Sequence, residues 1–160
     1  MAFYSTSPES LFFDAARRGD VALLQELIGQ QIDVNIRDGR GFTPLILATY
    51  EEHLEAAQIL IAAGAEVNIQ DYSGNTALMG VSFKGYAEIA NLLLANGADL
   101  NVQNGSGGTA LMFATLFGRN QIVKLLVEHG ADKTIRDSRG LTALDLALQQ
   151  GNEEAIPHLQ

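Results

Sequence analysis

The chain has no cysteine, no tryptophan and only three prolines among its 160 residues. Without cysteine there is no disulfide framework and no thiolate chemistry. No apolar run approaches the roughly 18 residues that a membrane span requires. Residues 1–10 contain neither a basic cluster nor an apolar core, so they predict no signal peptide and favour a cytoplasmic location.

Positive charge is also scarce, because ten Lys and Arg face nineteen Asp and Glu, for a formal net charge of -9. Proteins that bind nucleic acids or anionic membranes depend on clustered Lys and Arg. The composition therefore predicts no nucleic-acid partner and no membrane partner. With 47% apolar and 18% charged residues the chain is expected to fold, and its length predicts a single domain over residues 1–160.

Glycine is in excess, with sixteen residues where average usage gives roughly eleven. A 33-residue repeat explains most of this excess. A Thr-x-Leu motif begins at Thr43, Thr76, Thr109 and Thr142, and a Gly-Ala-acidic motif recurs at Gly64, Gly97 and Gly130. Eleven of the sixteen glycines fall into three phases of this repeat, which predicts turns and helix ends there.

Each repeat predicts two short helices. Thr109 is expected to cap the first helix, which buries Leu111 and Ala114, and a second helix is expected over Asn120–His129. Helices shorter than about 12–15 residues are marginal in isolation, so the repeats must stack on one another to form a core.

These motifs, in this order and at this period, resemble the ankyrin repeat over nearly the whole chain. The resemblance implies an all-α solenoid of about five stacked helix-turn-helix units with projecting hairpin loops. The expected units are an N-terminal cap over 8–37, three repeats over 38–70, 71–103 and 104–136, and a C-terminal cap over 137–160.

The chain departs from the family pattern at two kinds of position. The family's usual histidine is replaced by Ile46, Met79, Met112 and Asp145, so we expect no hydrogen-bonded ladder of histidines. Gln31 and Glu52 replace turn glycines, and we expect those two turns to deviate from the others.

Gly80 lies in the middle of a helix, and the equivalent residue one repeat later is Phe113. Because a glycine there costs about 1 kcal/mol relative to alanine, we hypothesise that Phe113 fills the volume that Gly80 leaves.

The two ends are expected to act as caps. Ser7 precedes Pro8 as a helix start, and Thr142 with Asp145 resembles a capping box. A last helix from about Asn152 contains Pro157 and should be short or irregular.

No catalytic constellation, metal site or cofactor motif is apparent. His53, His129 and His158 lie at non-equivalent phases and favour surface or capping roles over metal ligation. The glycine-rich segment 105–108 lacks the lysine of a phosphate loop and is interpreted as a hairpin tip. Glu51, Glu52 and Glu55 favour a solvated turn over paired catalytic carboxylates.

In ankyrin repeats, partners usually bind the hairpin tips and the exposed side of the first helix. Carrying this over gives a candidate partner-binding set of Arg40, Phe42, Tyr50, Tyr72, Phe83, Lys84, Leu116, Phe117 and Arg139. We expect its apolar members to form a concave stripe, flanked by Arg17, Arg18 and Arg40 at one end and by Arg139 at the other. The alternative is that these side chains only pack between neighbouring hairpins.

Between Gly41 and Gly118 there is one cation, Lys84, against seven acidic residues. This acidic middle favours either a partner with a basic patch or a solvated convex face.

The sequence predicts a non-enzymatic module that is monomeric in isolation and binds one protein partner, as an inhibitor, an immunity or antitoxin-like protein, or a scaffold. Alternatives are an accessory companion of a metabolic or oxidative-stress enzyme and, more remotely, an enzyme. A single stoichiometric partner in a pull-down supports binding, whereas turnover by the purified protein supports catalysis.

Overall fold

The computed structural model describes residues 7–160, and within that range every regular element is a helix. The predicted all-α class is therefore confirmed for this part of the chain. The helices, in chain order, are α1 Pro8–Arg18, α2 Val21–Gly29, α3 Pro44–Tyr50, α4 Leu54–Ala62, α5 Ala77–Lys84, α6 Ala87–Ala95, α7 Ala110–Leu116, α8 Asn120–Glu128, α9 Ala143–Gln150 and α10 Ile156–Leu159. Residues 1–6 of the expected domain lie outside the described residues.

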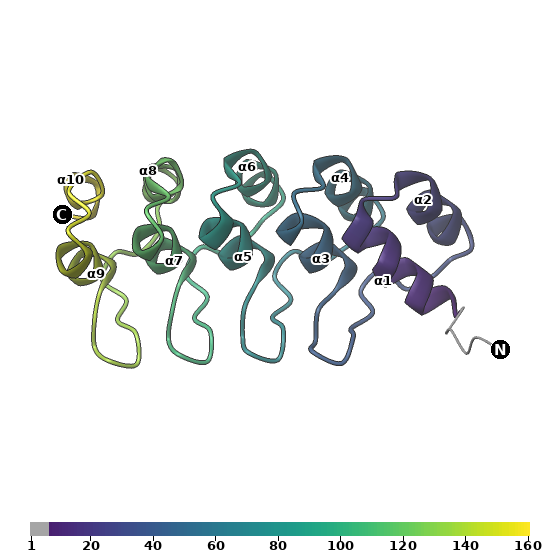
Figure 1. Ribbon diagram of the computed structural model, residues 1–160, viewed down its shortest axis with the longest axis horizontal. Helices are drawn as coiled ribbons and strands as arrows, with labels where there is room; N and C mark the ends of the chain where they lie inside the picture. Colours follow the sequence, from purple (N-terminus) through teal and green to yellow (C-terminus); the bar gives the residue numbers. More distant parts are fainter. Residues whose placement is uncertain (1–6) are drawn as a thin grey trace.

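The helices form two stacked rows (Figure 1). The odd-numbered helices make one row, the even-numbered helices make the other, and hairpin loops project from the odd-numbered row like fingers. Neighbouring odd-numbered helices pack more closely than neighbouring even-numbered ones over most of the array. The row therefore curves toward the odd-numbered helices, which makes the side that carries the fingers concave.

The core repeats with the sequence. Leu45, Leu78 and Leu111 are buried at one position of the odd-numbered helices, and Leu60, Leu93 and Leu126 are buried at one position of α4, α6 and α8. Because none of the described helices exceeds 11 residues, stability comes from burying these side chains between neighbours.

Side-chain caps begin the first helix of every repeat. The threonine hydroxyl groups of Thr43, Thr76, Thr109 and Thr142 accept the backbone N–H three residues later, at 3.2–3.3 Å. Ser7 caps α1 in the same way, and Thr142 with Asp145 forms a complete capping box. The predicted caps of these first helices are confirmed.

The last helix is short, as predicted, but it begins at Ile156 rather than near Asn152. A proline is tolerated in the first turn of a helix, where its missing N–H is not needed. The start at Ile156 places Pro157 in that turn.

All eleven glycines that follow the repeat have positive φ. Gln31 and Glu52, which replace two such glycines, have φ of 66° and 64°. The expectation that their turns deviate is wrong, because both residues adopt the left-handed conformation of the glycines. A side chain there costs about 1–2 kcal/mol, and packing of the flanking helices holds the turn in place.

The structure also corrects the expected pairing of Gly80 with Phe113. A Cβ built at Gly80 would lie 3.3 Å from Cδ2 of Tyr50. The side chain above Gly80 therefore comes from the preceding repeat, on α3, and not from Phe113 on α7.

Candidate functional site

The fingers are held rigid by one side chain at the base of each. Asp38, Asp71, Asn104 and Asp137 occupy this position, and Oδ1 of each accepts two backbone N–H groups of its own loop at 2.8–3.0 Å. Successive tips are joined by backbone hydrogen bonds, such as that from Tyr72 N–H to the Arg40 carbonyl at 3.1 Å.

A second series of hydrogen bonds between repeats runs along the loops that follow the even-numbered helices. Asn68 Oδ1 accepts the N–H of Asp99 at 2.7 Å, and its amide donates to the Gly97 carbonyl at 3.0 Å. Asn35 makes the equivalent pair of contacts with the next repeat, and Asn101 Oδ1 accepts the N–H of Asp132. These asparagines connect neighbouring repeats.

Apolar residues occupy the column where the family usually has histidine. Met79 and Met112 are buried, and Ile46 is partly buried. All three line hollows on the concave side. Asp145, the fourth member, bonds Thr142 of its own helix. Three members of the column therefore place apolar side chains in the walls of these hollows.

The larger hollow, called here the first hollow, has a volume of about 740 Å³. It lies between the fingers and the helices α3 and α5. Its apolar lining includes Phe42, Ile46, Leu47, Tyr50, Met79, Gly80, Phe83 and Phe113, and its charged lining is Arg17, Asp38, Arg40, Glu51 and Asp71.

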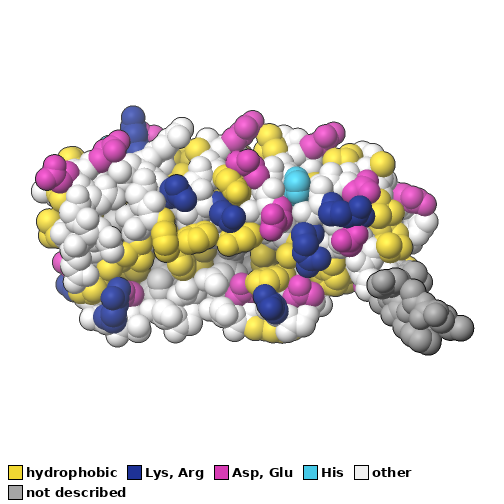
Figure 2. Space-filling model, in the orientation of Figure 1, with side chains coloured by type: hydrophobic (Ala, Val, Ile, Leu, Met, Phe, Trp, Pro, Cys, Tyr) yellow, Lys and Arg dark blue, Asp and Glu magenta, His cyan; other side chains and the backbone are white. Residues whose placement is uncertain are grey.

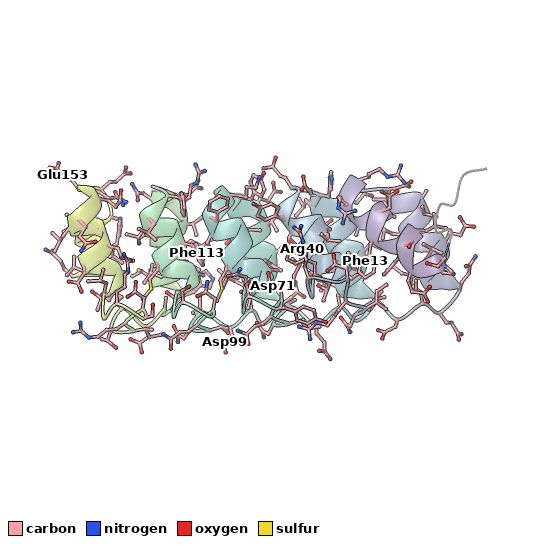
Figure 3. All side chains as sticks on the ribbon, turned by 60° about the horizontal axis from the view of Figure 1, so that its bottom comes forward. Phe13, Arg40, Asp71, Asp99, Phe113 and Glu153 are labelled. Carbon is pink, nitrogen blue, oxygen red and sulfur yellow. The ribbon has the colours of Figure 1, made fainter. Side chains whose placement is uncertain are left out.

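A smaller hollow of about 350 Å³, called here the second hollow, lies toward the C-terminal end. Leu116, Arg139 and Leu146 are part of its lining, and Phe113 lines both hollows. The side chain of Phe113 therefore lies between the two hollows. Figure 3 shows Arg40 and Asp71 near the middle of the array and Phe113 displaced from them toward the C-terminal end.

Three aromatic rings continue from the first hollow along the odd-numbered row. The rings of Tyr50 and Phe83 are parallel with centroids 6.4 Å apart, and Phe117 meets Phe83 edge-on at 4.5 Å. The ammonium group of Lys84 lies 4.6 Å from the centroid of Tyr50. Tyr50 is 39% exposed and Phe117 46%, so within residues 7–160 both rings keep apolar surface that faces solvent.

The predicted set thus divides between neighbouring surfaces. Arg40, Phe42, Tyr50 and Phe83 line the first hollow, and Leu116 and Arg139 line the second. Lys84 and Phe117 contact the rings of the first hollow.

Tyr72 lies apart from these residues. Its ring is 5.3 Å from the guanidinium carbon of Arg37 and packs against Gly41 of the preceding finger. Tyr72 therefore fits the alternative interpretation, packing between fingers, although 67% of it remains exposed.

The sequence prediction misses Phe113 and Met79 as residues that line the first hollow. The sequence prediction assigns Phe113 to the space beside Gly80. An aromatic residue in the column of Leu47, Gly80 and Leu146 is nevertheless a signal that this column differs between repeats. Arg17, which the sequence predicts to flank the stripe, lines the first hollow itself.

Charge is divided between the two rows. The segments 19–33, 52–66, 85–99, 118–132 and 151–160, which contain the even-numbered helices, carry twelve acidic residues and two cations. The other described segments, with the odd-numbered helices and the fingers, carry seven acidic residues and eight cations. Acidic side chains line the upper edge in Figure 2, and a band of hydrophobic side chains with Lys and Arg beside it crosses the middle.

The acidic middle expected from the sequence is therefore mostly on the outer side. Of the seven acidic residues between Gly41 and Gly118, only Glu51 and Asp71 line the first hollow. This favours the solvated convex face over a concave surface for a basic patch.

Three carboxyl groups have shifted pKa values, and none of them lines the first hollow. The pKa of Asp145 is lowered by hydrogen bonds from the backbone and side chain of Thr142, and that of Asp132 by bonds from Thr134. Burial raises the pKa of Asp137, but the N–H groups of Leu141 and Arg139 outweigh it and the net shift is downward. These shifts accompany helix and loop capping.

The side chains of His53 and His129 have structural contacts. His53 Nε2 lies 2.9 Å from the Arg17 carbonyl oxygen, and His129 Nδ1 lies 2.8 Å from that of Leu125. Among residues 7–160, no group of three or more His, Asp or Glu side chains is placed to hold a metal ion. In the same range no helix is long and apolar enough to cross a membrane.

Comparison with known proteins agrees with this geometry. A family model described as "Ankyrin repeats (3 copies)" matches residues 12–104 and 79–160. Ankyrin repeat domain-containing protein 29 of Danio rerio is 40% identical over 63 residues, and its Homo sapiens counterpart is 38% identical over the same length. Each match covers 38% of this chain and 21% of the relative, so the chain spans about a fifth of the curated relatives that it matches.

Proposed function

Because the chain belongs to the ankyrin repeat family, whose repeats are general protein-interaction modules, we propose that it binds one protein partner through its concave side. The observation that carries this proposal is the first hollow with its adjoining rings. Tyr50, Phe83 and Phe117 form a continuous aromatic surface on the rigid odd-numbered row.

The surface has the character of a binding site. Aromatic and Arg side chains are enriched among the residues that dominate binding energies, and both kinds line the first hollow. The fingers that border it are tied to one another by backbone hydrogen bonds, so little conformational entropy is lost on binding. The partner needs to match a preformed shape.

The mode of action that we propose is steric and does not involve catalysis. A bound partner has part of its surface covered, as by an inhibitor or an immunity-like protein, or is held in place, as by a scaffold. Either outcome requires only the concave surface.

The test is affinity capture with the full chain as bait, comparing two double variants. Tyr50→Ala with Phe83→Ala removes two rings of the concave surface. Leu11→Ala with Leu148→Ala removes two exposed apolar side chains outside it and is the matched control. We expect one stoichiometric partner with the wild type and the control, and a loss of that partner with the ring variant.

Thermal unfolding accompanies this experiment. Both Tyr50 and Phe83 keep exposed surface, so the ring variant should keep its helical content and lose no more than a few degrees of Tm. A partner held equally by both variants contradicts the proposal, as does turnover by the purified protein alone.

A further inference from the structure

Two asparagines of the chain are followed directly by glycine, Asn96 before Gly97 and Asn104 before Gly105. An Asn-Gly pair is the sequence in which an asparagine side chain is most readily deamidated, because glycine has no side chain to hinder attack by its backbone nitrogen. Asn96 lies at the C-terminal end of α6, in the even-numbered row, and Asn104 lies at the base of a finger. The two pairs therefore share their local sequence but differ in their surroundings.

Deamidation begins when the backbone nitrogen of the glycine attacks the side-chain carbonyl carbon of the asparagine. The nitrogen loses its proton to solvent and forms a bond to Cγ, and the bond between Cγ and Nδ2 breaks to release ammonia. Water then opens the resulting five-membered succinimide, which yields Asp or isoAsp without an oxidant or an enzyme. The side-chain amide and the glycine N–H must therefore leave their hydrogen bonds before they can react.

The side chain of Asn104 is tightly held. Its Oδ1 accepts two backbone N–H groups of its own finger at 2.9–3.0 Å, and its Nδ2 donates to Oδ1 of Asn75 in the preceding finger at 2.9 Å. The N–H of Gly105, whose nitrogen would attack, donates to the Ser73 carbonyl at 2.9 Å. Reaction at Asn104 therefore requires its finger to separate from the preceding one.

Asn96 is held less firmly. Its Nδ2 donates to the Leu92 carbonyl of its own helix at 2.8 Å, and within residues 7–160 its Oδ1 accepts no hydrogen bond. The N–H of Gly97 donates to the Leu94 carbonyl at 3.3 Å, which is longer than the roughly 2.7–3.2 Å of an ordinary bond. Both contacts belong to the last turn of α6, and Asn96 is exposed. Such helix ends open more readily than contacts between packed elements.

We infer that Asn96 is a site of spontaneous deamidation in the folded protein and that the finger protects Asn104 from the same reaction. This inference is independent of the proposed binding function. Local opening sets the rate of the reaction, because the amide and the glycine nitrogen can approach each other only in the open state. Fraying of the last turn of α6 is sufficient at Asn96, whereas Asn104 reacts only after two fingers come apart.

The product changes a contact between two repeats. A carboxylate at position 96 cannot donate to the Leu92 carbonyl, and it places negative charge at the C-terminal end of α6, where the helix dipole disfavours it. Glu66 of the preceding repeat lines the same hollow and adds a like charge. The isoAsp form lengthens the backbone before Gly97, whose carbonyl accepts the Nδ2 donor of Asn68. Deamidation should therefore weaken the second series of hydrogen bonds between repeats.

The experiment follows both sites during incubation of the full chain in mildly alkaline buffer. Trypsin cuts after Lys84 and Arg119 and nowhere between them, so one peptide, residues 85–119, carries Asn96 and Asn104. Mass spectrometry of this peptide and its fragments measures the conversion of each asparagine. The same chain unfolded in guanidinium chloride gives the reference rate for each site. Asn96→Gln, which would have to react through a slower six-membered ring, is the matched control.

In the unfolded chain we expect the two sites to convert at similar rates. In the folded protein Asn96 should convert at least about tenfold faster than Asn104, which requires a difference of only about 1.4 kcal/mol between the two opening free energies. The incubated wild type should gain an acidic form on ion exchange and lose roughly 1–4 °C of Tm, since a charge at a helix end has a small effect on stability. Asn96→Gln should show neither change.

Equal conversion of the two sites in the folded protein overturns the inference, as does faster conversion of Asn104. An Asn96 side chain that stays intact while the unfolded chain reacts overturns it too. Conversion at Asn96 without a loss of Tm removes the weakened contact between repeats and leaves only the modification. None of these outcomes involves a partner, so they are distinct from the capture experiment that tests binding.

Discussion

The recurring caps, finger hydrogen bonds and buried leucines, called here the scaffold, come from the same segments of the chain as the first hollow. The scaffold residues recur in successive repeats, whereas the residues of the hollow do not. At the base of the fingers, the same kind of residue makes the same hydrogen bonds every 33 residues, as the threonine caps also do. In the first hollow, the residues at equivalent positions differ from repeat to repeat: Leu47 is followed by Gly80 and then by Phe113.

This difference indicates that the scaffold stabilises the fold and supports the proposal that the first hollow serves binding. Residues that recur hold a geometry that every repeat shares, so they can be replaced only at a cost in stability. Residues that do not recur shape one place on the surface. Substitutions in the scaffold should therefore change the free energy of unfolding, and substitutions in the hollow should change binding.

The largest effect on stability should come from a recurring core position. Leu78 is 1% exposed and equivalent to Leu45 and Leu111. Leu78→Ala should destabilise the protein by about 2–5 kcal/mol, through lost burial and the cavity left behind. Urea unfolding followed by circular dichroism measures this, and a loss below about 1 kcal/mol would show that the repeats do not depend on this column.

A smaller effect should distinguish two buried hydroxyl groups at equivalent positions. The Thr115 hydroxyl donates to the Leu111 carbonyl at 2.8 Å, whereas the buried Ser82 hydroxyl has no hydrogen-bond partner among residues 7–160. Thr115→Val should cost about 1 kcal/mol, and Ser82→Ala should be neutral or stabilising. Equal losses in the two unfolding curves would mean that Ser82 is bonded in solution, for example to water.

A gain in stability is expected where a residue other than glycine occupies a left-handed turn of the scaffold. Gln31 has a φ of 66°, a conformation that costs a side chain about 1–2 kcal/mol. Gln31→Gly removes this strain but makes the unfolded chain more flexible, so a net gain of about 0.5–1 kcal/mol is expected. Gly64→Gln, at the equivalent turn, is the matched reverse change and should destabilise. A loss with Gln31→Gly would contradict the account of strained turns.

The smallest effect should be a dependence on pH at the C-terminal cap. The hydrogen bonds from Thr142 lower the pKa of Asp145 below its ordinary value of 3.8. A lowered pKa in the folded state contributes stability above the unfolded pKa, and this is lost as the pH falls through the folded value. The difference in Tm between the wild type and Asp145→Asn should therefore shrink below about pH 4. A difference independent of pH would mean that ionisation of Asp145 does not contribute to stability.

The scaffold could be predicted from the sequence because local chemistry decides it. A threonine before a helix and a glycine after one cap the helix through contacts within a few residues. The 33-residue repeat identifies these positions in the sequence. The same reasoning failed at Gln31 and Glu52, where packing of the flanking helices imposes the left-handed turn on residues that disfavour it.

The first hollow could be predicted only in part. The repeat predicts that side chains of the adjoining repeats lie near Gly80, but it does not predict which one contacts it. In the structure this neighbour is Tyr50. The position of the acidic residues could not be predicted for a related reason. The acidic residues of the middle repeats are close in sequence, yet most of them belong to the outer side, because each repeat contributes to both sides of the array.

The separation of scaffold and hollow is tested most directly by measuring Tm and partner retention together in one set of single alanine variants. Leu45, Leu78 and Leu111 represent the scaffold, and Arg17, Arg40, Tyr50 and Phe83 represent the hollow. The account predicts two groups: scaffold variants that lose Tm but retain the partner while folded, and hollow variants that keep Tm but lose the partner. Retention that falls in proportion to Tm across the whole set would contradict it.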